Sequence, residues 1–167
     1  MMKRNVLMLL MAAVVAFSCS SDKEDAGSEA SNIEGTWDAH ELMIDNATAS
    51  DDEKNGRDLL NFLTAKDCFI LSLTFNQDLT VITENSVNYL EINVNGSGTG
   101  LDVPCPTQSD MDNSTYTYDG QVVTFVDENA QTVSVDVSIS GNTMTVDAAD
   151  LDIPNFNTGG QLIFIRR

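Results

Sequence analysis

Few side chains in this sequence are suited to nucleophilic catalysis. His40 is the sole histidine, and no G-x-S-x-G motif marks a serine nucleophile. A serine or cysteine nucleophile needs a neighbouring general base, which is most often a histidine. His40 lies in a stretch that alternates like a strand, so a solvent-facing side chain is the simpler interpretation. We therefore expect a protein that is not an enzyme and has no catalytic residue.

Oxygen-rich stretches suggest a second kind of chemistry, the binding of a hard cation such as Ca²⁺. The first, third, fifth and sixth positions of an EF-hand loop are matched by Asp51, Glu53, Asn55 and Gly56. The twelfth position holds Phe62 where such a loop needs a bidentate acid. We therefore interpret these acids as solvated side chains, and we expect neither a metal site nor a cofactor.

The chain is strongly acidic. Its 167 residues include 26 Asp and Glu against 8 Lys and Arg, which gives a formal net charge of −18. Nucleic acids and anionic lipid surfaces repel such a protein. We therefore expect no nucleic-acid partner.

The first 18 residues have the pattern of a secretory signal peptide. Lys3 and Arg4 precede an apolar run over 6–17. This run is shorter than the roughly 20 residues that a membrane-spanning helix needs. We therefore predict that 1–18 are a signal peptide that is removed from the mature protein.

The apolar run ends at a cysteine, in Ala16-Phe17-Ser18-Cys19. This stretch resembles the lipobox of bacterial lipoproteins, which implies that Cys19 is acylated and holds the protein on a membrane. We therefore predict that 19–32 consist of the acylated Cys19 and a disordered tether, which the polar residues after the cysteine form. Ser20 to Asp25 resembles the acid-rich export signal of Bacteroidota lipoproteins, so we expect a lipid-anchored outer-membrane protein on the cell surface.

From Ile33 onward the pattern is that of β-strands. Val133, Val135, Val137 and Ile139 alternate with polar residues, as on a strand with one buried face. Counting similar runs predicts eight strands, near 35–44, 68–76, 79–85, 114–118, 121–126, 131–139, 142–148 and 160–166. Short turns join them, and Asp119-Gly120 is typical of a two-residue type I′ hairpin. The expected fold is all-β, an antiparallel up-and-down eight-stranded barrel.

Two segments interrupt the predicted strands. Ser50 to Glu53 form a capping box, which predicts a short helix between the first two strands. Its apolar edge from Leu59 to Leu63 would either gate the barrel or pack on it. The second segment, 85–112, mixes a possible extra strand (87–94) with glycines and prolines, and its path is not predicted.

Cys68 and Cys105 remain once Cys19 is assigned to lipid. A disulfide is the default for two cysteines in an oxidising compartment. It would fasten the 85–112 segment to the second strand and contribute roughly 4 kcal/mol by chain entropy.

At Gly35-Thr36-Trp37 the chain resembles the lipocalins and related calycin barrels, in which a G-x-W tryptophan closes one barrel end beneath a basic residue. Arg166 or Arg167 stands where that base is expected. The chain also resembles small lipocalin-like lipoproteins of Bacteroidota, through Leu73 to Asp78 and Tyr116 to Gly120. Leu79 departs from that pattern because a glycine is usual there. The resemblance covers 33–167 and implies a barrel domain and an anchored location.

The predicted barrel interior is the remaining candidate site. An eight-stranded barrel is either filled by its side chains or holds one small ligand, and for this small domain we expect a mostly filled interior. Should a ligand bind, the expected lining residues are Phe69, Leu71, Leu73, Phe75, Val135, Val137 and Met144.

Two functions remain open at this point. One is a non-enzymatic binding protein for a small apolar or amphipathic ligand. The other is a filled barrel that acts as an accessory subunit or inhibitor, with an envelope protein as partner. A cavity connected to solvent would favour the first.

Overall fold

The structure, a computed structural model, describes residues 32–94, 96, 100–127, 130–151 and 159–167. The predicted signal peptide, Cys19 and the tether up to residue 31 lie outside the described residues, and these predictions stay predictions. No helix within the described ranges is long and apolar enough to cross a membrane.

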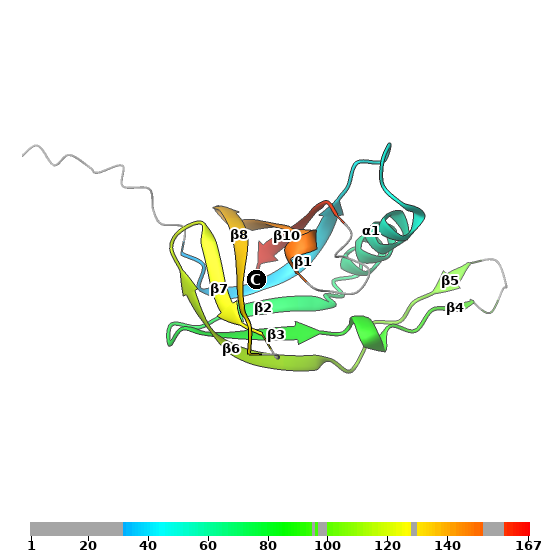
Figure 1. The fold of residues 1–167 in the computed structure, drawn as a ribbon. Helices are drawn as coiled ribbons and strands as arrows, with labels where there is room; N and C mark the ends of the chain where they lie inside the picture. The colour runs from blue at the N-terminus through cyan, green and yellow to red at the C-terminus, as the bar shows by residue number, and fades with distance from the viewer. Residues whose placement is uncertain (1–31, 95, 97–99, 128–129, 152–158) are drawn as a thin grey trace, which may run out of the picture.

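Eight antiparallel strands close into a barrel, which confirms the predicted fold class (Figure 1). Their order around the barrel is β1-β10-β9-β8-β7-β6-β3-β2, so each strand lies beside its neighbour in the meander. The strands are β1 (Gly35–Met43), β2 (Leu71–Phe75), β3 (Thr80–Asn85), β6 (Asp110–Tyr118), β7 (Val122–Val126), β8 (Thr132–Ser140), β9 (Thr143–Asp147) and β10 (Gln161–Arg166).

Helix α1 (Asp51–Thr64) lies between β1 and β2, as predicted. The capping box is present: the Ser50 hydroxyl accepts a hydrogen bond from the Glu53 backbone N–H at 3.2 Å, and the Ser50 N–H donates to the Glu53 carboxylate at 2.6 Å. Leu60 and Leu63 are buried against the barrel. The residues compared above with a calcium loop are therefore residues of a helix, in which the loop geometry does not form.

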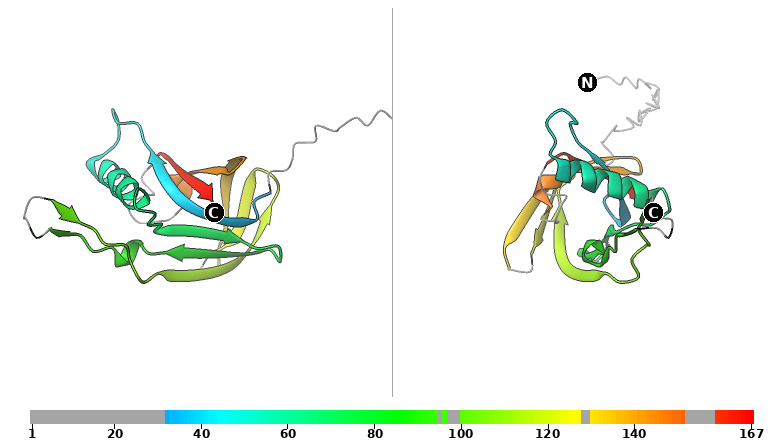
Figure 2. Two further views of the ribbon diagram at one scale, coloured as in Figure 1. Left: turned by 180° about the vertical axis from the view of Figure 1, so that it is seen from behind. Right: turned by 90° about the vertical axis from the view of Figure 1, so that its right-hand side faces the viewer.

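The segment between β3 and β6 forms an arm that leaves the barrel, which we define as 86–109. It contains the short helix η1 (Val87–Tyr89) and the paired strands β4 (Asn93–Val94) and β5 (Leu101–Asp102). The expected strand over 87–94 is thus wrong for most of its length. Figure 2 shows the β4–β5 pair reaching past α1 on the same side of the barrel.

Two turns show how backbone conformation follows residue type. The Ser140–Thr143 pair encloses Gly141-Asn142, with Gly141 at a φ of +60°. In Asp119-Gly120 only the glycine has a positive φ, so the predicted type I′ turn is wrong. The Asp119 carboxylate instead accepts hydrogen bonds from the N–H groups of Gln121 and Val122 at 2.9 and 2.8 Å, and this side-chain turn sets the hairpin.

Candidate functional site

One end of the barrel is closed by Trp37 and Arg166. The Trp37 side chain is fully buried, and its indole N–H donates to the Ile33 carbonyl at 2.7 Å. The Arg166 guanidinium lies 4.3 Å from the centre of the indole ring. It also donates to the Glu34 carbonyl at 2.7 Å and to the Asn32 carbonyl. We call this the closed end.

Arg167 is held beside the same end, outside the barrel. Its guanidinium donates to both carboxylate oxygens of Asp38, at 2.9 and 2.6 Å. The hydroxyl of Ser72 donates to Asp38 at 2.6 Å, and Asp38 and Ser72 are both buried. The hydrogen bonds to Asp38 raise the pKa of Arg167 above its ordinary value. Of the two arginines that the sequence left open, Arg166 is therefore over the tryptophan and Arg167 is paired with Asp38.

The barrel interior contains a cavity of about 370 Å³. This volume lies at the lower end of the range of about 300–1,000 Å³ that is usual for small-molecule pockets. The expectation of a mostly filled interior is therefore wrong. The apolar residues that line the cavity are Leu71, Leu73, Phe75, Val81, Val123, Phe125, Val126, Val133, Val135, Val137, Met144, Val146 and Leu151.

The predicted lining residues lie around this cavity with one exception. Leu71, Leu73 and Phe75 alternate along β2, while Val135 and Val137 of β8 and Met144 of β9 contribute from the opposite wall. Phe69 does not line the cavity, because β2 begins at Leu71 and not at residue 68. The apolar alternation in the sequence therefore begins at Phe69, before the strand itself begins at Leu71.

The cavity reaches the surface where β6 and β7 diverge. Strand β6 pairs with β3 from Asp110 to Thr115, but with β7 only from Tyr116 to Tyr118. Before Tyr116 in β6, where this pairing is absent, the Ser114 hydroxyl donates a hydrogen bond to the Val126 carbonyl at 2.7 Å. Asp112, Asn113 and Ser114 line the cavity beside this gap. A side chain thus joins the two strands where their backbone pairing has ended.

The polar residues of the cavity gather at this opening. Asp112 and Asp127 come from β6 and the end of β7, and Asp150 comes from the short helix η2 (Ala148–Asp150). Asp112 and Asp150 are exposed, whereas Met144 opposite is fully buried. We define the open end as the end that carries these three aspartates, and the floor as the part near Met144.

The open end has no basic residue near it in sequence. Between Asp67 and Ile165 the sequence contains no Lys, Arg or His.

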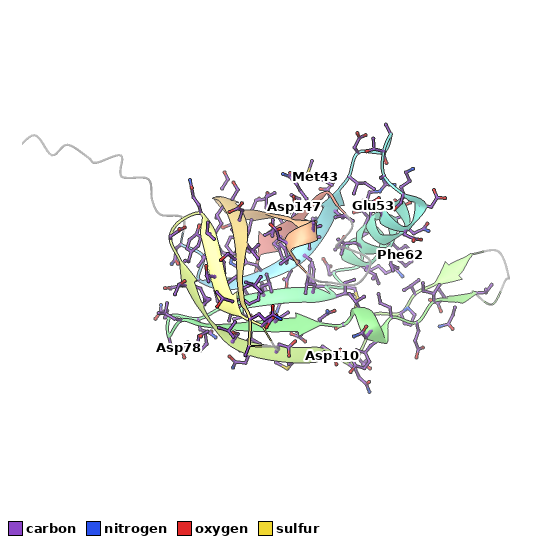
Figure 3. The ribbon with its side chains drawn as sticks, viewed as in Figure 1. Met43, Glu53, Phe62, Asp78, Asp110 and Asp147 are labelled. Atoms are coloured by element: carbon purple, nitrogen blue, oxygen red, sulfur yellow. A yellow bond between two sulfur atoms is a disulfide. The ribbon has the colours of Figure 1, made fainter. Side chains whose placement is uncertain are left out.

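Figure 3 marks Asp78 at the β2–β3 turn of the closed end, and Asp110 and Asp147 farther toward the other end of the barrel. Hydrogen bonds from Tyr89 at 2.7 Å and Asn88 at 3.0 Å hold the pKa of Asp110 below its ordinary value.

Helix α1 is not a lid over this cavity. None of its residues lines the cavity, and Leu60 and Leu63 pack into the core. The helix instead borders a separate surface groove together with the arm. Leu59 and Phe62 line it from the helix, and Val87, Leu90, Ile92 and Val103 line it from the arm. Figure 3 shows Phe62 on the part of α1 that faces the arm.

The Cys68–Cys105 disulfide predicted from the sequence is present. The two Cα atoms are 5.7 Å apart, and the bond closes a sequence separation of 37 residues. Cys68 precedes β2 and is buried, while Cys105 lies in the arm between β5 and β6. The bond fastens the base of the arm to the barrel beside the buried Val103.

Sequence reasoning missed the polar rim of the cavity. Asp112, Asp127 and Asp150 look like ordinary solvated acids in a chain with 26 of them. The early end of the β6–β7 pairing exposes the cavity beside them, and no local pattern encodes where two strands separate. The long run without a basic residue was the available signal.

Within the described residues no group of three or more His, Cys, Asp or Glu side chains is arranged to hold a metal ion. Comparisons with known proteins give no further guide to the site: no family model, no curated protein and no solved structure matches this chain.

Proposed function

We propose that this protein is a non-enzymatic, lipid-anchored protein of the cell envelope that binds a small apolar or amphipathic ligand in its barrel. The observation that carries the proposal is the cavity of about 370 Å³, with its apolar floor and its opening to solvent. Apolar surface inside a cavity gains free energy when a ligand of matching shape excludes water from it.

The anchoring part of the proposal rests on the sequence around Cys19. One acyl chain gives only marginal membrane binding, whereas the two or more chains of a bacterial lipoprotein give stable attachment. Wild-type protein produced in a bacterium with lipoprotein processing should pellet with membranes. We expect the Cys19→Ala variant to appear in the soluble fraction, and a variant that still pellets would refute the anchor.

The binding part can be tested through the methionine methyl groups. Met144 lies at the floor of the cavity, while Met43 is 51 % exposed on the barrel exterior and provides an internal control. We expect decanol to shift the methyl NMR signal of Met144 in a saturable way and to leave that of Met43 unchanged. The Met144→Leu variant assigns the signal. No saturable shift of Met144 with decanol or with other apolar probes of similar size would refute ligand binding.

The groove beside α1 favours a second candidate function, the binding of an envelope protein. Its apolar residues include Phe62 and Ile92, which are 41 % and 59 % exposed. Asp52 and Asp58 also line it, so the complementary partner is a segment with apolar side chains and flanking basic residues. A photo-crosslinking residue at position 62 should give a discrete product that Ile92→Asp abolishes. The same residue at position 136, on the exposed face of β8, should give none.

A further inference from the structure

We infer that the ligand of the barrel cavity is a cationic amphiphile, a hydrocarbon or aromatic body that carries a protonated amine or another permanent cation. This inference rests on the proposed function, because it names the chemical class of the ligand for the same cavity. Its two parts follow from two different regions of the cavity wall.

The floor selects an apolar body. Met144, Val146 and Val135 are each at most 2 % exposed and line the cavity on one side, with Phe75 and Val81 on the other. None of the described residues that line the cavity is basic. A carboxylate or phosphate on the ligand would therefore find no cationic side chain there to compensate its desolvation.

The opening selects a cationic head. Three aspartates, Asp112, Asp127 and Asp150, line the cavity at the open end. The Asp127 carboxylate also accepts a hydrogen bond from the Gln131 N–H at 2.7 Å, which fixes its position in the β7–β8 turn. A ligand with its body on the floor would extend its head among these acids. An ammonium group there would interact favourably with carboxylates, whereas an anionic head would be repelled.

The charge distribution of the rest of the protein strengthens this preference. The described basic side chains belong to α1 and its C-terminal end (Lys54, Arg57 and Lys66) or to the closed end (Arg166 and Arg167). Arg166 and Arg167 are engaged by backbone carbonyls and by Asp38. No described arginine or lysine is therefore part of the cavity wall, so a ligand cation at the opening would meet carboxylates and no cationic side chain of the described lining.

The experiment compares probes that share one hydrocarbon chain and differ in the head: decylammonium, decanol and decanoate. Binding is measured by calorimetry to the full chain with Cys19→Ala, so that no acyl chain competes. An exposed ion pair contributes up to a factor of about five in affinity. With several acids at the opening, we expect decylammonium to bind at least about ten-fold more tightly than decanoate, and more tightly than decanol. High salt should remove most of this excess.

Two variants locate the effect. Asp112→Asn with Asp150→Asn should lower the affinity for decylammonium several-fold more than the affinity for decanol. The matched control is Asp136→Asn, on the exposed outer face of β8 away from the cavity. It removes one acid where the double variant removes two, so a general attraction of cations to an acidic chain would lower decylammonium binding by the same factor for each acid removed.

The outcomes separate the two levels of the proposal. Two results would overturn the cationic class: equal affinities for decylammonium and decanoate, or a loss per acid removed that is the same in the double variant and in Asp136→Asn. Decanol binding would still support the cavity in either case. Failure of all three probes to shift the Met144 methyl signal would overturn the binding function itself.

Discussion

At the closed end of the barrel, Arg166 and Arg167 are engaged by the protein itself, one over the Trp37 ring and the other on the buried Asp38. At the open end, three aspartates line a cavity whose wall, in the part of the chain that the structure describes, contains no basic side chain. The closed end thus pairs its arginines within the protein, whereas no arginine or lysine is among the described residues that line the open end. This difference supports the proposal that the closed end stabilises the fold and that the open end binds a ligand.

The largest expected effect tests the structural role of the closed end. Trp37→Ala removes a fully buried side chain together with its hydrogen bond to the Ile33 carbonyl. It also removes the ring beneath Arg166. We expect a loss of about 5 kcal/mol in the free energy of unfolding, measured with urea.

The matched variant at the cavity wall is Phe125→Ala. Phe125 is half-buried and lines the cavity, so its loss removes fewer contacts. We expect a loss of about 2 kcal/mol. Equal losses in the two variants would contradict the contrast between the two ends.

The second prediction concerns the disulfide, which constrains the arm at the open-end side. Replacing both Cys68 and Cys105 by alanine should lower the free energy of unfolding by about 4 kcal/mol, because it removes a constraint on the unfolded chain. The cavity wall contains neither cysteine, so decanol binding under folding conditions should remain. Loss of binding in a folded double variant would show that the arm shapes the cavity.

The sequence allowed the barrel to be predicted because its signals are local. Neighbouring residues encode the alternation in β8 and the capping box at Ser50. The pairing of Cys68 with Cys105 follows by elimination, once Cys19 is assigned to lipid. The start of β2 and the opening of the cavity are not encoded in this way. Both depend on where pairing with another strand stops, as at Tyr116 in β6, and that position results from the packing of the whole barrel. The cavity volume likewise depends on many side chains together.

The third prediction tests the strain in the β2–β3 turn at the closed end. Leu79 has a φ of +63° and is 54 % exposed, in the position where the resemblance leads one to expect glycine. A left-handed conformation costs a non-glycine residue about 1–2 kcal/mol, part of which glycine loses again through the greater freedom of its unfolded chain. Leu79→Gly should therefore raise the free energy of unfolding by about 0.5 to 1 kcal/mol.

Two variants at the same position serve as controls for Leu79→Gly. Leu79→Ala keeps the unfavourable φ and should give no comparable gain, while Leu79→Val, which is β-branched, should destabilise the protein. A gain with alanine as large as that with glycine would assign the effect to the lost apolar side chain.

The smallest expected effect separates acids with a structural role from those of the cavity opening. The N–H groups of Val122 and Gln121 hold the pKa of Asp119 below its ordinary value of 3.8. Because the folded pKa is the lower one, the charged Asp119 stabilises the hairpin above the unfolded pKa, and this contribution disappears as pH falls through the folded pKa. Asp119→Asn should therefore be slightly less stable than wild type at neutral pH, and the difference should shrink as pH falls past 3.8 and disappear below the lowered pKa of the folded state. Urea unfolding across this range measures it. A difference that stays constant with pH would mean that the charge of Asp119 does not stabilise the turn, and the contrast with Asp112, whose role we place in ligand binding, would then be lost.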